Sequence, residues 1–291
     1  MRHAANGKGR PSRLARAVIG CSVALAGLAL ASQARAECSR EMLQKLAATY
    51  VEAQSTGQPA LVPLADGAYY GENDLPVKIA EGVLAQALKV DFTRSFHDTT
   101  QCATFTELTA ATNPHPYVIH TRMEATADGK VTVMESVVTD EDDWVFGADA
   151  HLAQTRVEDW GEIPEDRRDR RGVLKAAADA YINNWGDPDL PVPHGTPCAR
   201  LEGRIYTGSR NPEGQTCTMG AFPQPIETGS RRYVIDETVG AVSIFHKFSW
   251  IDAGLGPYHP GTPASQTFRI ERGMNRYIHE VTACTTPKCS R

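Results

Sequence analysis

The sequence predicts an α+β fold that occurs twice along the chain. Three observations predict it: apolar and aromatic positions recur about 130 residues apart, each copy opens with helical periodicity, and each closes with strand-like alternation. The stretch Leu43 to Tyr50 returns as Leu174 to Tyr181, and Val62-Pro63 returns as Val192-Pro193. A repeat of this length has the size of a small domain. We therefore expect one helix-on-sheet fold, duplicated and fused.

The first 36 residues have the order of a secretory signal. Basic residues come first, an apolar run extends from Ala17 to Ala31, and Ala34-Arg-Ala36 precedes Glu37. We expect cleavage after Ala36 and a secreted or periplasmic protein of residues 37–291. The apolar run is too short to span a bilayer comfortably, so no membrane insertion is expected.

Charge narrows the choice of partners. Loss of the signal would remove six of the 30 basic residues and none of the 35 acidic ones, which leaves a net charge of about −11. That balance argues against nucleic acid and anionic membrane surfaces as partners. We expect a small-molecule ligand or substrate instead.

Six cysteines remain after the signal, and an even number in an exported chain indicates disulfides. Fifteen pairings are possible, but the domain repeat favours bonds within a domain. No close two-residue cysteine spacing or neighbouring histidine indicates zinc, and we expect no metal. The predicted pairs are Cys38 with Cys102, Cys198 with Cys217, and Cys284 with Cys289.

The first domain is expected to occupy residues 37–146. An amphipathic helix covers Met42 to Ala53, and a segment rich in Pro and Gly breaks it. Farther along, alternating residues predict two strands around a turn at Asp128-Gly129. The remaining elements predicted for this domain are a second helix at Ile79 to Lys89 and strands at Tyr117 to Met123 and Val131 to Val138.

The second domain is expected at residues 172–291, after a linker at 147–171. Its helix begins near Leu174, and a Gly-rich stretch tied by cysteines replaces the second helix of the first domain. The charged run Glu165 to Arg171 is interpreted as solvated linker or a first helical turn, with an anion site as the alternative. Strands are predicted at Arg232 to Asp236, Ala241 to Phe248, Gln266 to Ile270 and Asn275 to Val281.

These features together resemble the SnoaL-like and nuclear-transport-factor-2-like superfamily, whose domains are cones of helices packed on a curved antiparallel sheet. The resemblance rests on the helices ending at Tyr50 and Tyr181, the helix breaks, and the hairpins Arg122 to Val138 and Arg269 to Thr282. The second half also looks like a group of secreted fungal and bacterial proteins of unknown function built from tandem cones. Because such domains commonly dimerise through their sheets, the resemblance implies an internal pseudo-dimer.

The resemblance also implies a class of chemistry. The superfamily includes isomerases, cyclases, dehydratases and lyases, which move a proton next to a carbonyl or phenol without a cofactor. That chemistry needs a carboxylate or imidazole whose pKa an apolar pocket brings toward working pH, and a second group that stabilises an oxyanion.

The second copy concentrates residues suited to this chemistry. We predict Glu202, Asp236 and His279 as catalytic, with Arg200 and Arg232 as substrate-binding residues. By strand alternation Arg232 and Asp236 share one face, where they either form a structural ion pair or line the cone.

The first copy has counterparts for two of these residues. The repeat places Glu135 opposite His279 on the last long strand, where both either line their cones or lie on an exposed polar face. It also places Glu72 opposite Glu202, either bracing the segment after the helix break or standing at the pocket rim beside Tyr70. We therefore add Tyr70, Glu72 and Glu135 as substrate-binding candidates.

The leading hypothesis is an exported small-molecule enzyme of lyase or isomerase type, with one working cone and one supporting domain. A non-catalytic exported ligand-binding protein is the alternative, and a structural protein with filled cones is a third. The sequence lacks a Gly-x-Ser-x-Gly elbow, a Gly-rich phosphate loop and a dinucleotide fingerprint, which argues against serine hydrolases and nucleotide enzymes.

Overall fold

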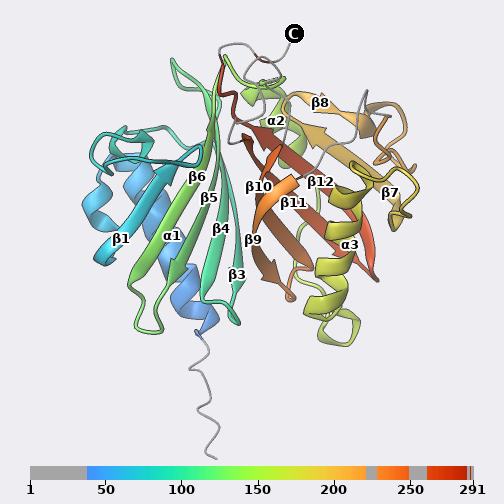
Figure 1. The fold of residues 1–291 in the computed structure, drawn as a ribbon, viewed down its shortest axis with the longest axis horizontal. Coiled ribbons are helices and arrows are strands. Elements are labelled where there is room, and N and C mark those ends of the chain that lie inside the picture. The colour runs from blue at the N-terminus through green and yellow to red at the C-terminus, as the bar shows by residue number, and fades with distance from the viewer. Residues whose placement is uncertain (1–37, 221–227, 249–260, 287–288, 290–291) are drawn as a thin grey trace, which may run out of the picture. The chain divides into compact units, whose positions relative to one another are not determined.

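The computed structural model describes residues 38–220, 228–248, 261–286 and 289, and these contain two six-stranded sheets of the same strand order (Figure 1). The predicted signal at residues 1–36 lies outside the described residues. The first sheet has the order β2-β1-β6-β5-β4-β3, with β1 (Leu64–Glu72), β2 (Leu75–Pro76), β3 (Phe92–Asp98), β4 (Ala103–Ala110), β5 (Tyr117–Ala125) and β6 (Val131–Thr139). The second has the order β8-β7-β12-β11-β10-β9, with β7 (His194–Glu202), β8 (Ile205–Tyr206), β9 (Thr228–Asp236), β10 (Ala241–Phe248), β11 (Thr262–Glu271) and β12 (Met274–Thr282).

Strand pairing confirms both the α+β class and the duplication. Neighbouring strands are antiparallel except for β1 with β6 and β7 with β12, which are parallel. Glu72 lies opposite Ser136 in the first sheet, and Glu202 lies opposite Glu280 in the second. The two copies therefore correspond residue by residue along these strands.

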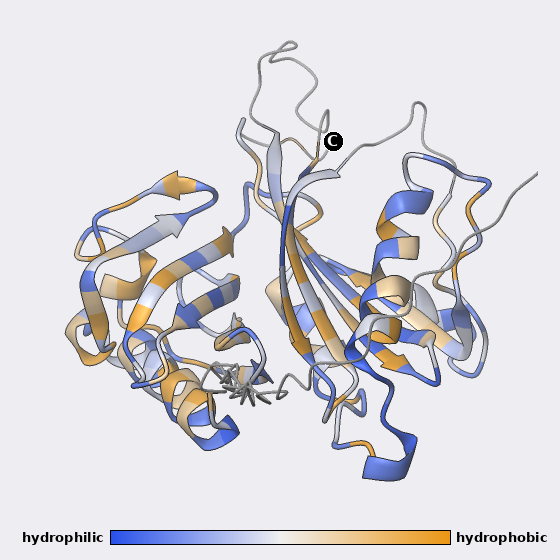
Figure 2. Cartoon of the chain, turned by 60° about the horizontal axis from the view of Figure 1, so that its bottom comes forward, coloured by the Kyte–Doolittle hydropathy of each residue, from blue (hydrophilic) through white to orange (hydrophobic). Residues whose placement is uncertain are grey.

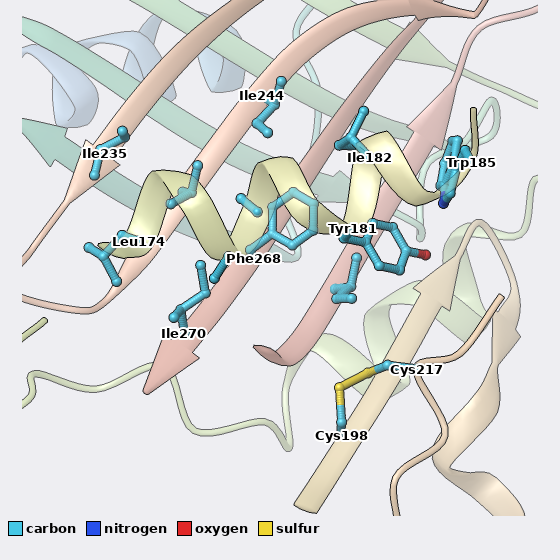
Figure 3. Close-up of a cluster of buried hydrophobic side chains, with 14 of the residues drawn as sticks. Leu174, Tyr181, Ile182, Trp185, Cys198, Cys217, Ile235, Ile244, Phe268 and Ile270 are labelled. Carbon is cyan, nitrogen blue, oxygen red and sulfur yellow. A yellow bond between two sulfur atoms is a disulfide. The ribbon is translucent and has the colours of Figure 1, made fainter. Parts of the chain in front are cut away.

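Each sheet has a helix on one face, which we call the inner face. Helix α1 (Arg40–Thr56) begins after Ser39, whose hydroxyl accepts from the Met42 amide, and ends at Gly57 in the left-handed conformation. Helix α3 (Arg171–Asn184) buries Leu174 and Tyr181 against Phe268 and its neighbours (Figure 3). Both helices match the predicted amphipathic segments, because their apolar stripes recur at helical spacing.

The predicted second helix at Ile79 to Lys89 is wrong. Only a single 3₁₀ turn, η2 (Val83–Ala85), forms there. The amide of Gln54, fully buried on α1, donates to the carbonyls of Val83 and Gln86 at 2.9 and 3.0 Å. These bonds use carbonyls that a longer helix would need for its own ladder, so the segment stays tied to the end of α1.

The predicted linker contains ordered structure. Helix α2 (Ala148–Thr155) buries His151 and Leu152, and a further 3₁₀ turn, η3 (Glu165–Arg167), precedes α3. The charged run ends at Arg171, and α3 begins at this residue. The end of the run therefore lies in a first helical turn, which is one of the two interpretations given above. Two more 3₁₀ turns lie at η1 (Pro59–Leu61) and η4 (Thr207–Arg210).

The outer faces of the two sheets pack on each other. Phe105 of β4 and Phe245 of β10 meet edge to face at 6.3 Å between ring centroids. Around them lies an apolar cluster drawn from both sheets, and Figure 2 shows such apolar positions along the strands in orange. This packing confirms the internal pseudo-dimer, because it buries in one chain the surface that two subunits would share. The cluster includes Phe96, Val118, Val137, Ala148, Trp160, Val234, Ala241 and Val281.

All three predicted disulfides are present: Cys38 with Cys102, Cys198 with Cys217, and Cys284 with Cys289. Three disulfides in one chain fit an oxidising compartment. Among the residues that the structure describes, no helix has the length and hydropathy needed to cross a membrane.

Candidate functional site

Charged and polar side chains converge on the inner face of the second sheet. Arg200 and Glu202 alternate along β7, and Glu280 lies opposite Glu202 on β12. Gln266 of β11 stands opposite Glu280, so one row across three strands carries Glu202, Glu280 and Gln266. Tyr181 of α3 lies on the same face, within the apolar cluster beneath the helix (Figure 3).

Arg200 and Glu202 form the edge of this group. The Arg200 Nη1 atom donates to Glu202 Oε2 at 3.1 Å, and the Trp144 indole donates to Glu202 Oε1 at 2.6 Å. Arg200 also contacts the sulfur of Met219. The side chains of Arg200 and Glu202 are 12 % and 17 % exposed, so solvent reaches this edge of the group.

Glu280 lies deeper and is 5 % exposed. Its two carboxyl oxygens accept from Gln266 Nε2 at 2.8 Å and from the Thr282 hydroxyl at 2.9 Å. Burial, and then the charge of Glu202, raise the pKa of Glu280 to about 8. Glu280 is therefore a neutral acid that holds a proton at pH 7.

Tyr181 and Arg200 influence each other's protonation. Burial would lower the pKa of Arg200, but Tyr181 and Glu202 outweigh it and leave that pKa raised. Burial likewise raises the pKa of Tyr181 above its ordinary value. The inner face thus holds a fixed cation, a carboxylate partner and two protonated donors.

His246 is a further titratable group on the same face. It lies opposite Ala264, which lies opposite Thr282, in the row beside Glu280. Its ring is fully buried against Phe248 at 4.7 Å, and neither ring nitrogen has a hydrogen-bond partner. Burial lowers the pKa of His246 to about 3, so the ring is neutral.

The first sheet carries no comparable group at the same positions. Ser136 stands where the second sheet has Glu280, and Tyr70 stands where it has Arg200. Ser136 pairs with the Thr121 hydroxyl at 2.8 Å, and Thr121 donates to the Tyr50 hydroxyl at 2.8 Å. At the position of Glu280 the first sheet therefore has a hydroxyl group, which is hydrogen-bonded through Thr121 to Tyr50 of α1.

Glu72 matches the bracing interpretation. Its Oε1 atom accepts from the Val83 amide at 2.6 Å and from the Tyr70 hydroxyl. The bond from Val83 ties β1 to the segment before β3, and the bond from Tyr70 lies within β1. Burial, and then Glu72, raise the pKa of Tyr70 above its ordinary value.

His279 and Glu135 do not line the cones as expected. Both side chains lie on the outer faces, whereas Ile278 belongs to the apolar cluster under α3. The prediction assigned His279 and Glu135 to the wrong face of each sheet because both faces are buried. Apolar alternation then no longer distinguishes the inner face from the outer one.

His279 instead joins a buried ionic cluster between the sheets. Its Nδ1 atom is 3.0 Å from Glu107 Oε1, and its Nε2 atom is 2.6 Å from Glu158 Oε2. Arg94 donates to the other Glu107 oxygen at 3.2 Å. Burial would lower the pKa of His279, but Glu158 and Glu107 raise it to about 9. His279 and Arg94 in turn hold the pKa of Glu107 well below its ordinary value, against the effect of burial.

Arg232 and Asp236 share the outer face of β9, as alternation predicted, but they neither pair with each other nor line the cone. Arg232 donates to Glu135 and to Asp74, both at 2.7 Å. Asp236 accepts both Nη groups of Arg40, at 2.8 and 2.9 Å. Each contact crosses from one copy to the other, so these residues hold the two halves together.

The sequence reasoning missed Glu280, Glu107 and His151. Glu280 and Glu107 are each the single acidic residue within their strand, and this was the available signal, since such groups are buried only with partners. His151 gave no such signal, because its helix lies within the expected linker at 147–171.

Two surface cavities lie away from the polar row. A cavity of about 420 Å³ is lined by four arginines and three carboxylates, and it includes Arg167 of the charged run considered as an anion site. A second, of about 730 Å³, lies beside the end of α1 and is mainly apolar, lined by residues that include Pro59, Ala60, Val62, Leu64, Ile79 and Ala85.

Comparisons with known proteins give a partial match. Residues 167–282 match a family described as a domain of unknown function, DUF8021. The chain is also similar to the solved structure of an NTF-2-like protein of unknown function from Burkholderia xenovorans LB400, with 16 % identity and a TM-score of 0.28. That similarity covers 39 % of this chain and 92 % of the other. No curated protein matches the chain.

Proposed function

We propose that the second domain is an acid–base enzyme of lyase or isomerase type acting on a small molecule, and that the first domain supports it. The observation that carries the proposal is Glu280, a buried carboxyl whose raised pKa of about 8 keeps it protonated at neutral pH. A neutral carboxylic acid beside a cation is suited to donating a proton to a developing oxyanion.

The proposed roles follow from the row of side chains. Arg200 would bind the oxygen that becomes negative, and Glu280 would donate its proton to that oxygen. Glu202, which is held by Arg200 and Trp144, would accept the proton from the neighbouring carbon. The isomerisation is completed when Glu202 gives its proton to a different carbon of the substrate and the substrate oxygen returns its proton to Glu280. Both carboxyl groups are then restored, and no further reactant is needed.

The other predicted site residues receive different roles. His279, Asp236, Arg232 and Glu135 lie on the outer faces, where their ion pairs join the two copies. Tyr70 and Glu72 brace the first domain. The asymmetry between the inner faces supports a single working site, since only the second has a cation and a neutral acid at corresponding positions.

We also propose that the protein acts after export, with residues 1–36 as its signal. The three disulfides support this part of the proposal, because such bonds persist outside the reducing cytosol.

Ligand binding without catalysis is the second candidate. The apolar cavity of about 730 Å³ beside α1 favours it, because its volume suits a small apolar molecule. This candidate places the ligand in the first domain, so the two candidates are separable by mutation.

Proton exchange tests the proposal without knowledge of the substrate. The mature protein is incubated in D₂O with a panel of small enolisable ketones and phenols, and deuterium incorporation is followed by NMR. We expect exchange with at least one probe, its loss in Glu280→Gln and Arg200→Met, and its retention in the matched first-domain variant Ser136→Ala. Absence of exchange with every probe, or equal loss in Ser136→Ala, would contradict an active site in the second domain.

A further inference from the structure

Three metal-ligating side chains meet at a buried point between the two sheets. Glu107 of β4 lies opposite His120 of β5, and His151 of α2 approaches the same point. All three residues are fully buried. One potential ligand atom from each lies within 4.8 Å of those of the other two.

His120 has a free ring nitrogen at this point. Its Nδ1 atom is 3.0 Å from the Ser265 hydroxyl of the second sheet, whereas its Nε2 atom has no hydrogen-bond partner. Leaving a buried ring nitrogen without a partner costs free energy. A metal ion on Nε2 would remove that cost, and the Nδ1 contact is the outer hydrogen bond that fixes the ring of a metal-bound histidine.

His151 brings a second ring nitrogen to the same point. Its Nε2 atom lies 2.7 Å from Glu107 Oε1, and its Nδ1 atom faces the Gly203 carbonyl at 3.3 Å. In the tautomer whose Nδ1–H donates to that carbonyl, the Nε2 lone pair is available to bind a metal ion.

Glu107 would offer its Oε1 atom to such an ion. Arg94 donates to Oε2 at 3.2 Å, whereas Oε1 lies 3.0 Å from His279 Nδ1 and 2.7 Å from His151 Nε2. Two imidazole nitrogens and one carboxylate oxygen form a donor set typical of Zn²⁺, with a fourth position for water.

We propose that Glu107, His120 and His151 bind one Zn²⁺ ion between the two halves of the chain. The ion would join β4, β5 and α2, and its outer hydrogen bonds would reach Ser265 and Gly203 of the second half. Its role is structural, because the site is fully buried and lies on the opposite face of the sheets from Glu280. This departs from the sequence expectation of a chain without metal.

The test measures metal content and stability in the mature protein with its disulfides intact. The protein is stripped with chelator, refolded with excess Zn²⁺ or Co²⁺, and dialysed. We expect one ion per chain, a tetrahedral Co²⁺ absorption spectrum, and a melting temperature that rises with Zn²⁺. His120→Asn should lose all three effects. His246→Asn is the matched control, because it also replaces a buried histidine without a partner and should keep them.

X-ray absorption at the zinc edge of the wild-type protein provides a readout that does not depend on the variants. Two imidazole ligands and oxygen ligands are expected. A wild-type protein that retains no stoichiometric zinc after refolding would overturn the proposal. So would sulfur ligands, or a folded His120→Asn variant that binds as tightly as wild type.

Discussion

Arg40, at the start of α1, binds Asp236, at the end of β9, through both guanidinium nitrogens at 2.8 and 2.9 Å. The same relationship occurs in reverse: Arg171, at the start of α3, binds Asp98, at the end of β3, through two contacts of 2.7 Å. Each half thus uses the first residue of its helix to hold an edge strand of the other. Such reciprocal contacts are those of a symmetric dimer interface, here within one chain.

Breaking one of these pairs should destabilise the whole chain. Asp236 is 1 % exposed, so Arg40→Met would leave a buried carboxylate without its cation. We expect the free energy of unfolding to fall by about 3 kcal/mol, measured by urea denaturation. The control Lys78→Met removes an exposed ion pair and should change it by less than about 1 kcal/mol. Equal effects of the two variants would show that the cross-half pair is not stabilising.

Stability should depend on pH through Glu280. Its pKa is about 8 in the folded chain against an ordinary value of 4.5, so the folded state binds more protons than the unfolded state between these values. The stabilisation that the protonated form contributes is fully present below pH 4.5 and is lost as pH rises toward 8. Across this range the free energy of unfolding falls by up to about 1.4 kcal/mol per pH unit. Denaturation of wild type and Glu280→Gln at several pH values should therefore show the variant gaining relative stability as pH rises. A pH-independent difference would contradict the raised pKa.

Replacing His279 should affect folding and leave the chemistry of the second domain intact. His279→Gln removes the cation between Glu107 and Glu158, and we expect a loss of about 3 kcal/mol in urea denaturation. His115→Gln, at an exposed ion pair, is the control and should change little. Folded His279→Gln protein should retain deuterium exchange at the wild-type rate. Selective loss of exchange with unchanged stability would instead restore the original assignment of His279 as catalytic.

The disulfides should differ in their contribution according to the loops that they close. Cys38 and Cys102 are 64 residues apart, whereas Cys284 and Cys289 are 5 apart. Chain entropy predicts a loss of about 4 kcal/mol for the double alanine variant of the first pair and about 2 kcal/mol for the second. Thermal denaturation of both variants checks the order, and a larger effect at the C-terminal pair would contradict it.

Much of the fold was predictable because local patterns and tertiary packing agree. The apolar residues at helical spacing from Leu43 and from Leu174 predicted α1 and α3. The pair Asp128-Gly129 predicted the turn between β5 and β6, and Gly129 adopts a positive φ there. The helix expected at Ile79 does not form because the side chain of Gln54, distant in sequence, donates hydrogen bonds to the carbonyls of Val83 and Gln86. No local pattern reports such a contact.

The candidate site was only partly predictable. The repeat correctly paired Glu72 with Glu202 and Glu135 with His279, as the strand registers show. It could not decide which face of β12 pointed inward, because the other half of the chain buries the outer face too. One position along the strand separates His279 in the ionic cluster from Glu280 beneath α3.

The most direct test of the proposed site is a carbon-13 NMR titration of the Glu280 side-chain carboxyl in the wild-type protein, assigned by its absence in Glu280→Gln. The proposed acid requires a midpoint near pH 8. A midpoint near the ordinary value of 4.5 would mean that Glu280 is charged at neutral pH and would contradict the proposed chemistry.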